Sequence, residues 1–275
     1  MSEYELLDSG NLEKLERFGP YVLRRPDPQA LWEPRQSSIL WDTCDAWFER
    51  KGEKGTWHFN KELPEGWEIP YGGFTFLIRP TSFKHVGLFP EQIENWEWVA
   101  KQKAKNVLNL FAYTGGATLA VASVGASVTH VDASKTAVEW ARKNAELSGL
   151  TDAPVRWIVD DVMKFVHREI KRGTRYDGII LDPPAFGHGP KDELWKIEED
   201  LVPLMQKCRE LVSDTPTFVL MNGYASGYSH YAFEHLLEPL LKTHGGSVEG
   251  GELTIQEKES TRLLPAGIYA RWTAN

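Results

Sequence analysis

Cysteine is scarce in this 275-residue chain, which carries only Cys44 and Cys208. Two cysteines exclude both a disulfide framework and a zinc site built from several cysteines. The histidines are scattered without the spacing of metal ligands, so we expect no metal site. The chain also lacks an apolar run of about 18 residues and an N-terminal secretion signal. These absences predict a soluble protein of the cytoplasm that has no membrane segment.

Positive charge is also in short supply. Lysine and arginine together number 31, against 39 aspartates and glutamates, and the net charge is −8 at pH 7. Because binding to nucleic acid backbones depends on lysine and arginine, this balance argues against a protein that coats nucleic acid non-specifically. It leaves room for a basic patch on one face. The length suffices for one large domain, or for one α/β domain with a smaller appendage.

The dinucleotide fingerprint G-x-G-x-x-G is missing from the stretch that most resembles a nucleotide-binding unit. This stretch, Asn106–Asp132, comprises an apolar strand, a glycine turn, a small-residue helix and a second strand that ends in the acidic residue Asp132. That order is the first half of a Rossmann-like unit, in which the glycines admit a ligand and the acid holds a ribose diol. A cofactor with ribose and adenine but no pyrophosphate fits, and S-adenosylmethionine (SAM) is such a cofactor. The missing fingerprint disfavours a nicotinamide-dependent oxidoreductase.

Strands and helices keep alternating after this stretch, with a helix N-cap predicted at Ser134 and a long helix predicted over residues 192–212. Such alternation produces a parallel sheet with helices on both faces, so we predict an α/β fold with a Rossmann-like, doubly wound sheet of about seven strands. Residues 1–80 contain short strand-like segments between turns and predict a small mainly-β domain. We expect residues 81–105 to form a helical connection and residues 106–275 to form the catalytic domain.

Three acids, Asp132, Asp161 and Asp182, follow successive predicted strands. Because the carboxyl ends of parallel strands share one edge of a sheet, we expect these acids to border one site. The first would accept hydrogen bonds from ribose hydroxyls. The second, beside the apolar Val162, would lie near the adenine amino group.

The third acid opens the segment D-P-P-A-F, which ends at Phe186. Two prolines stop the strand and fix the backbone, so we expect the acid and the proline carbonyls to point into the ligand crevice. The Phe186 ring can stack on a planar base. Glycines on both sides of His188 suggest a mobile loop that closes over a substrate.

Three segments together resemble a known family: NLFAYTGGAT, VDASKTAVEWARKNAELSGL and ILDPPAFG. They resemble class I SAM-dependent methyltransferases and, within these, the RlmI-like 23S ribosomal RNA cytosine-5 methyltransferases. The resemblance covers residues 80–225 and implies SAM as the cofactor and RNA as the partner. By resemblance, the cofactor-binding residues are Phe89, Gln92, Phe111, Tyr113, Thr114, Gly115, Gly116, Asp132, Ala133, Ser134, Asp161, Val162 and Asp182. The residues assigned in this way to catalysis and to the substrate side are Asp182, Pro183, Pro184 and Phe186.

One departure from that group changes the expected chemistry. Methylation of cytosine C5 needs a thiolate that adds to the ring, and the group's cysteine follows the fifth strand, where residues 221–227 contain none. Cys208 falls in a helical pattern, where a buried thiol is inert. An amine, ring nitrogen or oxygen needs only alignment with the methyl group and a proton acceptor, for which His85 and His188 are candidates. The group's N-terminal PUA domain is also not recognisable.

The sequence therefore predicts a SAM-dependent methyltransferase that modifies a base in ribosomal RNA by direct in-line transfer. One alternative is a methyltransferase that acts on a small molecule or a protein, and another is a SAM-binding module without catalysis. RNA as the substrate predicts a basic cluster near the crevice mouth. The residues expected in that cluster are Arg24, Arg25, Arg35, Lys84, Arg262 and Arg271.

Overall fold

The computed structural model describes residues 3–51, 54–82, 84–224 and 227–275. The chain forms two compact units. The first comprises Met1–Glu91 with Thr254–Ala266, and the second comprises Gln92–Leu253 with Gly267–Asn275. The division of the chain into residues 1–80, 81–105 and 106–275 remains a prediction. Within the described residues, no helix has the length and apolar content needed to cross a membrane.

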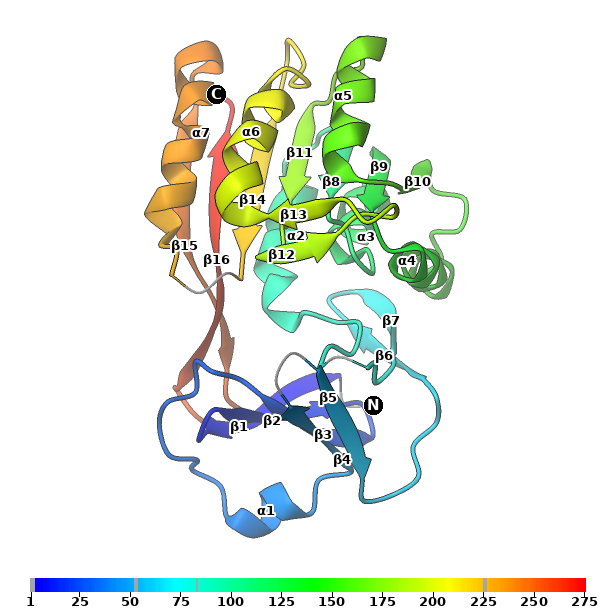
Figure 1. Cartoon of the computed structure of the whole chain (residues 1–275), viewed down its shortest axis with the longest axis vertical. Helices are drawn as coiled ribbons and strands as arrows, with labels where there is room; N and C mark the ends of the chain where they lie inside the picture. The colour runs from blue at the N-terminus through cyan, green and yellow to red at the C-terminus, as the bar shows by residue number, and fades with distance from the viewer. Residues whose placement is uncertain (1–2, 52–53, 83, 225–226) are drawn as a thin grey trace. The chain divides into compact units, whose positions relative to one another are not determined.

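A seven-stranded sheet forms the centre of the second unit, in the order β10-β9-β8-β11-β14-β16-β15 (Figure 1). Its strands are β8 Asn106–Leu110, β9 Ser127–Asp132, β10 Val155–Val159, β11 Gly178–Leu181, β14 Phe218–Gly223, β15 Ser247–Gln256 and β16 Leu263–Thr273. The first five run parallel, and β16 is antiparallel to β14. The predicted Rossmann-like sheet of seven strands is confirmed.

Six helices accompany this sheet and cover both of its faces in Figure 1. They are α2 Ile93–Lys101, α3 Gly116–Ser123, α4 Lys135–Leu147, α5 Val162–Arg172, α6 Ile197–Arg209 and α7 His230–His244. The predicted cap of α4 is confirmed, because Ser134 Oγ accepts from the Ala137 N–H at 3.2 Å. Asp161 caps α5 in the same way, at 2.8 Å from the Lys164 nitrogen. Both side chains satisfy N–H groups that have no partner inside the helix.

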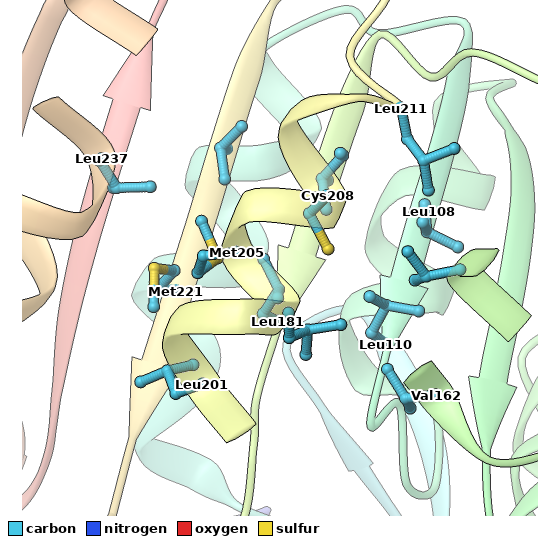
Figure 2. Close-up of a cluster of buried hydrophobic side chains, with 14 of the residues drawn as sticks. Leu108, Leu110, Val162, Leu181, Leu201, Met205, Cys208, Leu211, Met221 and Leu237 are labelled. Atoms are coloured by element: carbon cyan, nitrogen blue, oxygen red, sulfur yellow. The ribbon is translucent and has the colours of Figure 1, made fainter. Parts of the chain in front are cut away.

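The core of the second unit lies between the sheet and helices α5, α6 and α7. Figure 2 shows Leu108, Leu181 and Met221 from three neighbouring strands meeting Met205 and Cys208 of α6. Burial raises the pKa of the Cys208 thiol to about 12. A thiol that stays protonated inside an apolar core is a poor nucleophile. The expectation that Cys208 is buried in a helix is thus confirmed.

The predicted helix over residues 192–212 is wrong in its first part. A short hairpin of β12 Phe186–His188 and β13 Leu194–Lys196 precedes α6, which begins only at Ile197 (Figure 1). The buried side chain of Trp195 holds β13 extended, and this contact overrides the local helical preference. The glycines beside His188 therefore belong to a hairpin rather than to an open loop.

The first unit is mainly β, as predicted. Its strands are β1 Tyr4–Gly10, β2 Glu13–Phe18, β3 Tyr21–Pro26, β4 Ala46–Lys51 and β5 Lys54–Phe59 in one sheet, and β6 Trp67–Tyr71 and β7 Phe74–Ile78 in another. A short helix, α1 Ser38–Asp42, and a 3-10 turn, η1 Pro90–Gln92, complete its elements. The strand β2 has the sequence EKLERF, whose charged residues are not typical of a strand, so the sequence did not predict it. Inside the unit, Glu16 and Arg25 form a buried ion pair at 2.7 Å.

Glu91 makes the stability of the protein depend on pH. Burial raises the pKa of its carboxyl from 4.5 to about 7. Because the folded-state pKa lies above the unfolded one, the contribution of Glu91 to stability is fully present below pH 4.5 and is lost as the pH rises through 7. The shift corresponds to ~3 kcal/mol. We therefore expect the free energy of unfolding of the wild type to fall by about 3 kcal/mol more than that of Glu91→Gln when the pH rises from 5 to 8. Denaturant unfolding of both proteins at the two pH values measures this difference. An equal difference between the two proteins at both pH values would contradict this account.

Candidate functional site

The site that the sequence predicts lies at one edge of the seven-stranded sheet. Leu110 at the end of β8 is in register with Val131 in β9 and with Leu181 in β11, and Leu181 is in register with Met221 in β14. Four parallel strands thus end at nearly the same level. Ligands of open α/β sheets bind beyond such carboxyl ends. The structure therefore brings together the loops that follow β8, β9, β11 and β14.

The loop after β8 has an unusual backbone. Phe111 and Tyr113 have positive φ angles of 56° and 46°, which side-chain-bearing residues adopt only when their surroundings hold them there. Gly115 has φ 90°, and a Cβ atom on it would lie 3.0 Å from Ala141 Cβ. Thr114 is buried, and its carbonyl accepts from Asn144 Nδ2 at 2.9 Å. The loop is therefore tightly specified, with glycine required at its sharpest turn.

Asp132 joins this loop to the end of β9. Its carboxylate accepts from the backbone N–H groups of Tyr113 and Ser134, each at 2.8 Å. Burial raises the pKa of the Asp132 carboxyl, while these two hydrogen bonds oppose the rise. A carboxylate has about four acceptor positions, so two are left after the backbone bonds. The neighbouring Ala133 is half-buried and Ser134 is exposed. This arrangement suits a carboxylate that accepts from a vicinal diol.

Polar side chains of β8, β9 and α3 support the loop, and no motif in the sequence predicted them. Thr118 Oγ1 lies 2.9 Å from His130 Nδ1 and accepts from Asn109 Nδ2 at 2.9 Å. Burial lowers the pKa of His130 to about 3, so its ring is neutral at physiological pH. A Cβ atom on Gly115 would lie 3.7 Å from the His130 ring. The available signal was a histidine and an asparagine inside two otherwise apolar strands.

Asp161 follows β10 and lies one strand further along the sheet. One of its oxygens caps α5, as described above, and Val162 beside it is buried. The neighbouring Asp160 accepts from the Asp161 N–H at 2.9 Å and pairs with Arg168. The structure thus gives Asp161 a capping role, and its contact with adenine remains a prediction.

The D-P-P-A-F segment leaves β11 in an extended path. The backbone N–H of Asp182 lies 3.3 Å from the Leu110 carbonyl, which ties the segment to β8. Pro183 is buried and Pro184 is exposed. The Pro184 carbonyl was expected to face the crevice, but it accepts from Trp195 Nε1 at 2.7 Å. Its direction is thus set by a buried indole, a partner that no local pattern in the sequence revealed.

Phe186 presents its ring to solvent at the start of the β12–β13 hairpin. Its exposed fraction is 57%, which is high for a phenylalanine, and its ring lies 5.3 Å from the His188 ring in an edge-on arrangement. His188 Nδ1 in turn lies 3.0 Å from Asp192 Oδ1. An exposed aromatic ring beside a histidine can accept a flat ligand by stacking. The position of Phe186 agrees with the role predicted for it, which remains a prediction.

Gln92 is buried in a polar network at the end of β14. It donates to the Tyr224 hydroxyl at 2.6 Å and accepts from Asn95 Nδ2 at 2.9 Å. Asn95 also donates to Asn222 Oδ1 at 2.8 Å and accepts from Arg271. Residues 225 and 226, in the segment where the sequence lacks a cysteine, lie outside the described residues. The network fixes the backbone at the fourth strand end of the site.

Two predicted site residues belong to the first unit. The Phe89 ring lies 5.3 Å from the ring of His85 there. Burial, together with the nearby positive charge of Arg25, lowers the pKa of His85 to about 4. His85 is therefore neutral at physiological pH and half-buried within its own unit.

The predicted basic cluster is wrong for two of its members. Arg25 is buried and its charge is balanced by Glu16. Arg271 is buried and donates two hydrogen bonds to Asn95. These two side chains stabilise the interiors of their own units, so they cannot supply exposed positive charge for a phosphate backbone. Lys84 is half-buried, and burial lowers the pKa of its amino group.

A family model described as S-adenosylmethionine-dependent methyltransferase matches residues 48–232 of this chain. The chain belongs to this family. A crystal structure of a SAM-dependent methyltransferase from Agrobacterium tumefaciens is 42% identical, covers 100% of this chain and 91% of its own, and superposes with a TM-score of 0.94. The enzyme is therefore a class I SAM-dependent methyltransferase, and SAM is its cofactor.

Two further relatives illustrate how far the similarity reaches. A ribosomal RNA large subunit methyltransferase K/L from Stutzerimonas stutzeri is 31% identical over 220 residues, which are 76% of this chain. The match spans only 29% of that longer relative. A putative SAM-dependent methyltransferase from Streptococcus mutans covers 98% of this chain and 75% of its own, with a TM-score of 0.74 and 18% identity. At that identity it supports the fold alone.

The chemistry of the sheet edge fits this cofactor. Asp132 offers two acceptor positions for a ribose diol, and the tight turn at Gly115 leaves backbone close to them. No group of three or more histidine, cysteine, aspartate or glutamate side chains that could hold a metal ion occurs among the described residues.

Proposed function

We propose that this methyltransferase modifies a base in ribosomal RNA by direct in-line transfer of the methyl group. The single observation that carries this proposal is the exposed Phe186 ring two residues after the rigid Asp182-Pro183-Pro184 segment. Unpaired bases are commonly held by stacking on aromatic side chains, and their edges by fixed acceptors. The Stutzerimonas relative is a ribosomal RNA large subunit methyltransferase, which supports the same substrate class. RNA of that kind also implies action in the cytoplasm.

The resemblance to the RlmI-like group is part of this proposal, but its thiolate chemistry is not. Both cysteines of the chain, Cys44 and Cys208, are buried, and burial raises the pKa of each thiol. Neither can supply a thiolate that adds to a pyrimidine ring. A nitrogen or oxygen acceptor needs no covalent intermediate, so direct transfer suits this set of side chains.

Each group of residues has a distinct task in the proposed mechanism. Asp132 and the loop through Tyr113 and Gly115 bind and orient the cofactor, which supplies the methyl group when bound. Asp182 and the Pro183 carbonyl hold the edge of the base, and Phe186 stacks on its face. Alignment of this kind contributes most of the rate in a reaction whose leaving group is already good. His188, exposed and close to the Phe186 ring, is the proposed acceptor of the released proton.

A second candidate is methylation of a small molecule or a protein. The net charge of −8 and the burial of Arg25 and Arg271 favour it, because an RNA enzyme would gain from exposed positive charge. The two candidates differ in which molecule receives the methyl group.

Incubation with methyl-tritiated SAM distinguishes these functions. The acceptors are an unmodified transcript of bacterial large-subunit ribosomal RNA, the same RNA taken from ribosomes, and a protein extract with its small molecules. We expect label in the transcript at a single nucleotide, identified by nuclease digestion and mass spectrometry. Label confined to protein or small molecules would establish the second candidate instead. SAM binding without any labelled product would identify a non-catalytic SAM-binding module.

A further inference from the structure

Trp195 lies between two loops of the proposed site, although it belongs to neither. Its side chain is buried, with an exposed fraction of 8%, and it is part of the core cluster of the second unit. Its indole Nε1 donates to the Pro184 carbonyl at 2.7 Å. Its ring centroid lies 4.8 Å from that of Phe111, the residue that leaves β8 in the left-handed region. One side chain thus contacts both the loop after β8 and the loop after β11.

The chemistry of proline makes the first of these contacts unusually important. Pro183 and Pro184 have no N–H group, so this part of the loop can be anchored by hydrogen bonds only through its carbonyl oxygens. The Pro184 carbonyl uses the indole of Trp195, and the next carbonyl, of Ala185, accepts from the Ile197 N–H at 3.0 Å. The direction of the whole segment therefore depends on two N–H donors held by β13 and the start of α6.

The hairpin presents its two faces to different surroundings. Successive residues of a strand point to opposite faces. In the register of the hairpin, Trp195 is paired with Gly187, while the flanking pairs are Phe186 with Lys196 and His188 with Leu194. Trp195 is buried, whereas Phe186 and Leu194 are more than half exposed. Anchoring of the inward face by Trp195 thus fixes where the outward face holds the Phe186 ring.

We propose that Trp195 is a positioning residue that holds the acceptor loop at a fixed distance from the cofactor loop. The inference rests on the proposed function, since it takes Asp182, Pro183 and Phe186 to hold the methyl acceptor. The indole N–H sets the direction of the Pro184 carbonyl. The ring supports the strained backbone at Phe111. In-line transfer is sensitive to misplacement of this kind, because the acceptor atom must lie on the axis of the breaking bond.

Two substitutions separate the two contacts. Trp195→Phe keeps an aromatic ring against Phe111 but removes the donor to Pro184, so we expect kcat to fall about tenfold while the Kd for SAM is unchanged. Trp195→Leu removes both contacts, so we expect the Kd for SAM to rise about fivefold as well. The measurements are calorimetric titration with SAM and steady-state methylation of the ribosomal RNA transcript.

Trp272 offers a matched control. It is fully buried in β16, and its Nε1 donates to the Gly245 carbonyl at 2.9 Å, the same kind of bond. It pairs with Val219 near the amino end of β14, away from the strand ends that border the site. We expect Trp272→Phe to lower stability about as much as Trp195→Phe, with kcat and the Kd for SAM unchanged.

The outcomes separate this inference from the function on which it rests. Equal kcat values for the two phenylalanine variants, both below the wild type, would reduce Trp195 to a packing residue and overturn the inference. A wild type that binds SAM but methylates no RNA would refute the proposed substrate alone. In that case the SAM affinities still test the inference. An unchanged Kd for SAM in Trp195→Leu would show that Trp195 does not support the loop after β8.

Discussion

Replacement of Asp132 by alanine is expected to weaken SAM binding about a hundredfold, because it removes the carboxylate that we propose accepts two hydrogen bonds from the ribose hydroxyls. The same change frees the backbone N–H groups of Tyr113 and Ser134, which the carboxylate now holds at 2.8 Å. The loop after β8 then loses its fixed distance from β9. Calorimetric titration with SAM and with S-adenosylhomocysteine measures the effect.

Two further variants make the interpretation specific. Asp152→Ala removes an exposed aspartate from the turn before β10, so the Kd for SAM should equal that of the wild type. Asp132→Asn keeps the shape and one neutral acceptor, so its Kd should fall between those of the wild type and the alanine variant. Wild-type affinity in Asp132→Ala, with the fold intact by circular dichroism, would remove Asp132 from the cofactor site.

Replacement of Phe186 by alanine is expected to lower kcat/KM for the RNA about thirtyfold, since stacking of one base on an aromatic side chain contributes about 1–3 kcal/mol. Because the ring is 57% exposed, its removal leaves no cavity in the core, and the melting temperature should stay unchanged. The Kd for SAM should also stay unchanged. Initial rates of label transfer at several RNA concentrations give the value.

The choice of replacement tests stacking itself. Phe186→Tyr keeps a flat ring and should retain nearly all the activity, whereas Phe186→Leu keeps apolar bulk without a ring and should resemble the alanine variant. Full activity in Phe186→Leu would show that the residue contributes only apolar contact. Full activity in Phe186→Ala would exclude it from the acceptor side of the site.

These two variants report on different halves of one reaction. Asp132 is held by backbone N–H groups at the end of β9, and Phe186 extends from a hairpin that follows β11. A loss of cofactor affinity in the first and of RNA efficiency in the second, each without the other, would agree with separate cofactor and acceptor loops on neighbouring strands. Trp195 contacts both loops, so we expect Trp195→Leu to lower both the affinity for SAM and the rate of methylation.

The sequence alone determined the sheet and the positions of its ligand-facing loops. Apolar runs such as Val107–Leu110 form buried parallel strands, and the turn residues that follow them are local signals. The N-cap at Ser134 was predicted for the same reason, since a hydroxyl three residues from its N–H partner needs no distant contact. Acids placed after successive strands must then meet at one edge of the sheet.

Only the tertiary structure decided how side chains far apart in the chain pair with one another. Arg25 and Arg271 were expected at the surface, yet Glu16 and Asn95 hold them inside. The β12–β13 hairpin replaced a predicted helical turn because Trp195 gains more from burial against Phe111 than from helix formation.

The network that holds Gln92 at the end of β14 joins Asn95 to Asn222, 127 positions apart in the sequence. No local pattern specifies such a pair, since its stability comes from burying polar groups only where their partners are already in place. The sequence therefore determined which strand ends form the site. The long-range packing of polar and aromatic side chains decided how rigidly those ends are held.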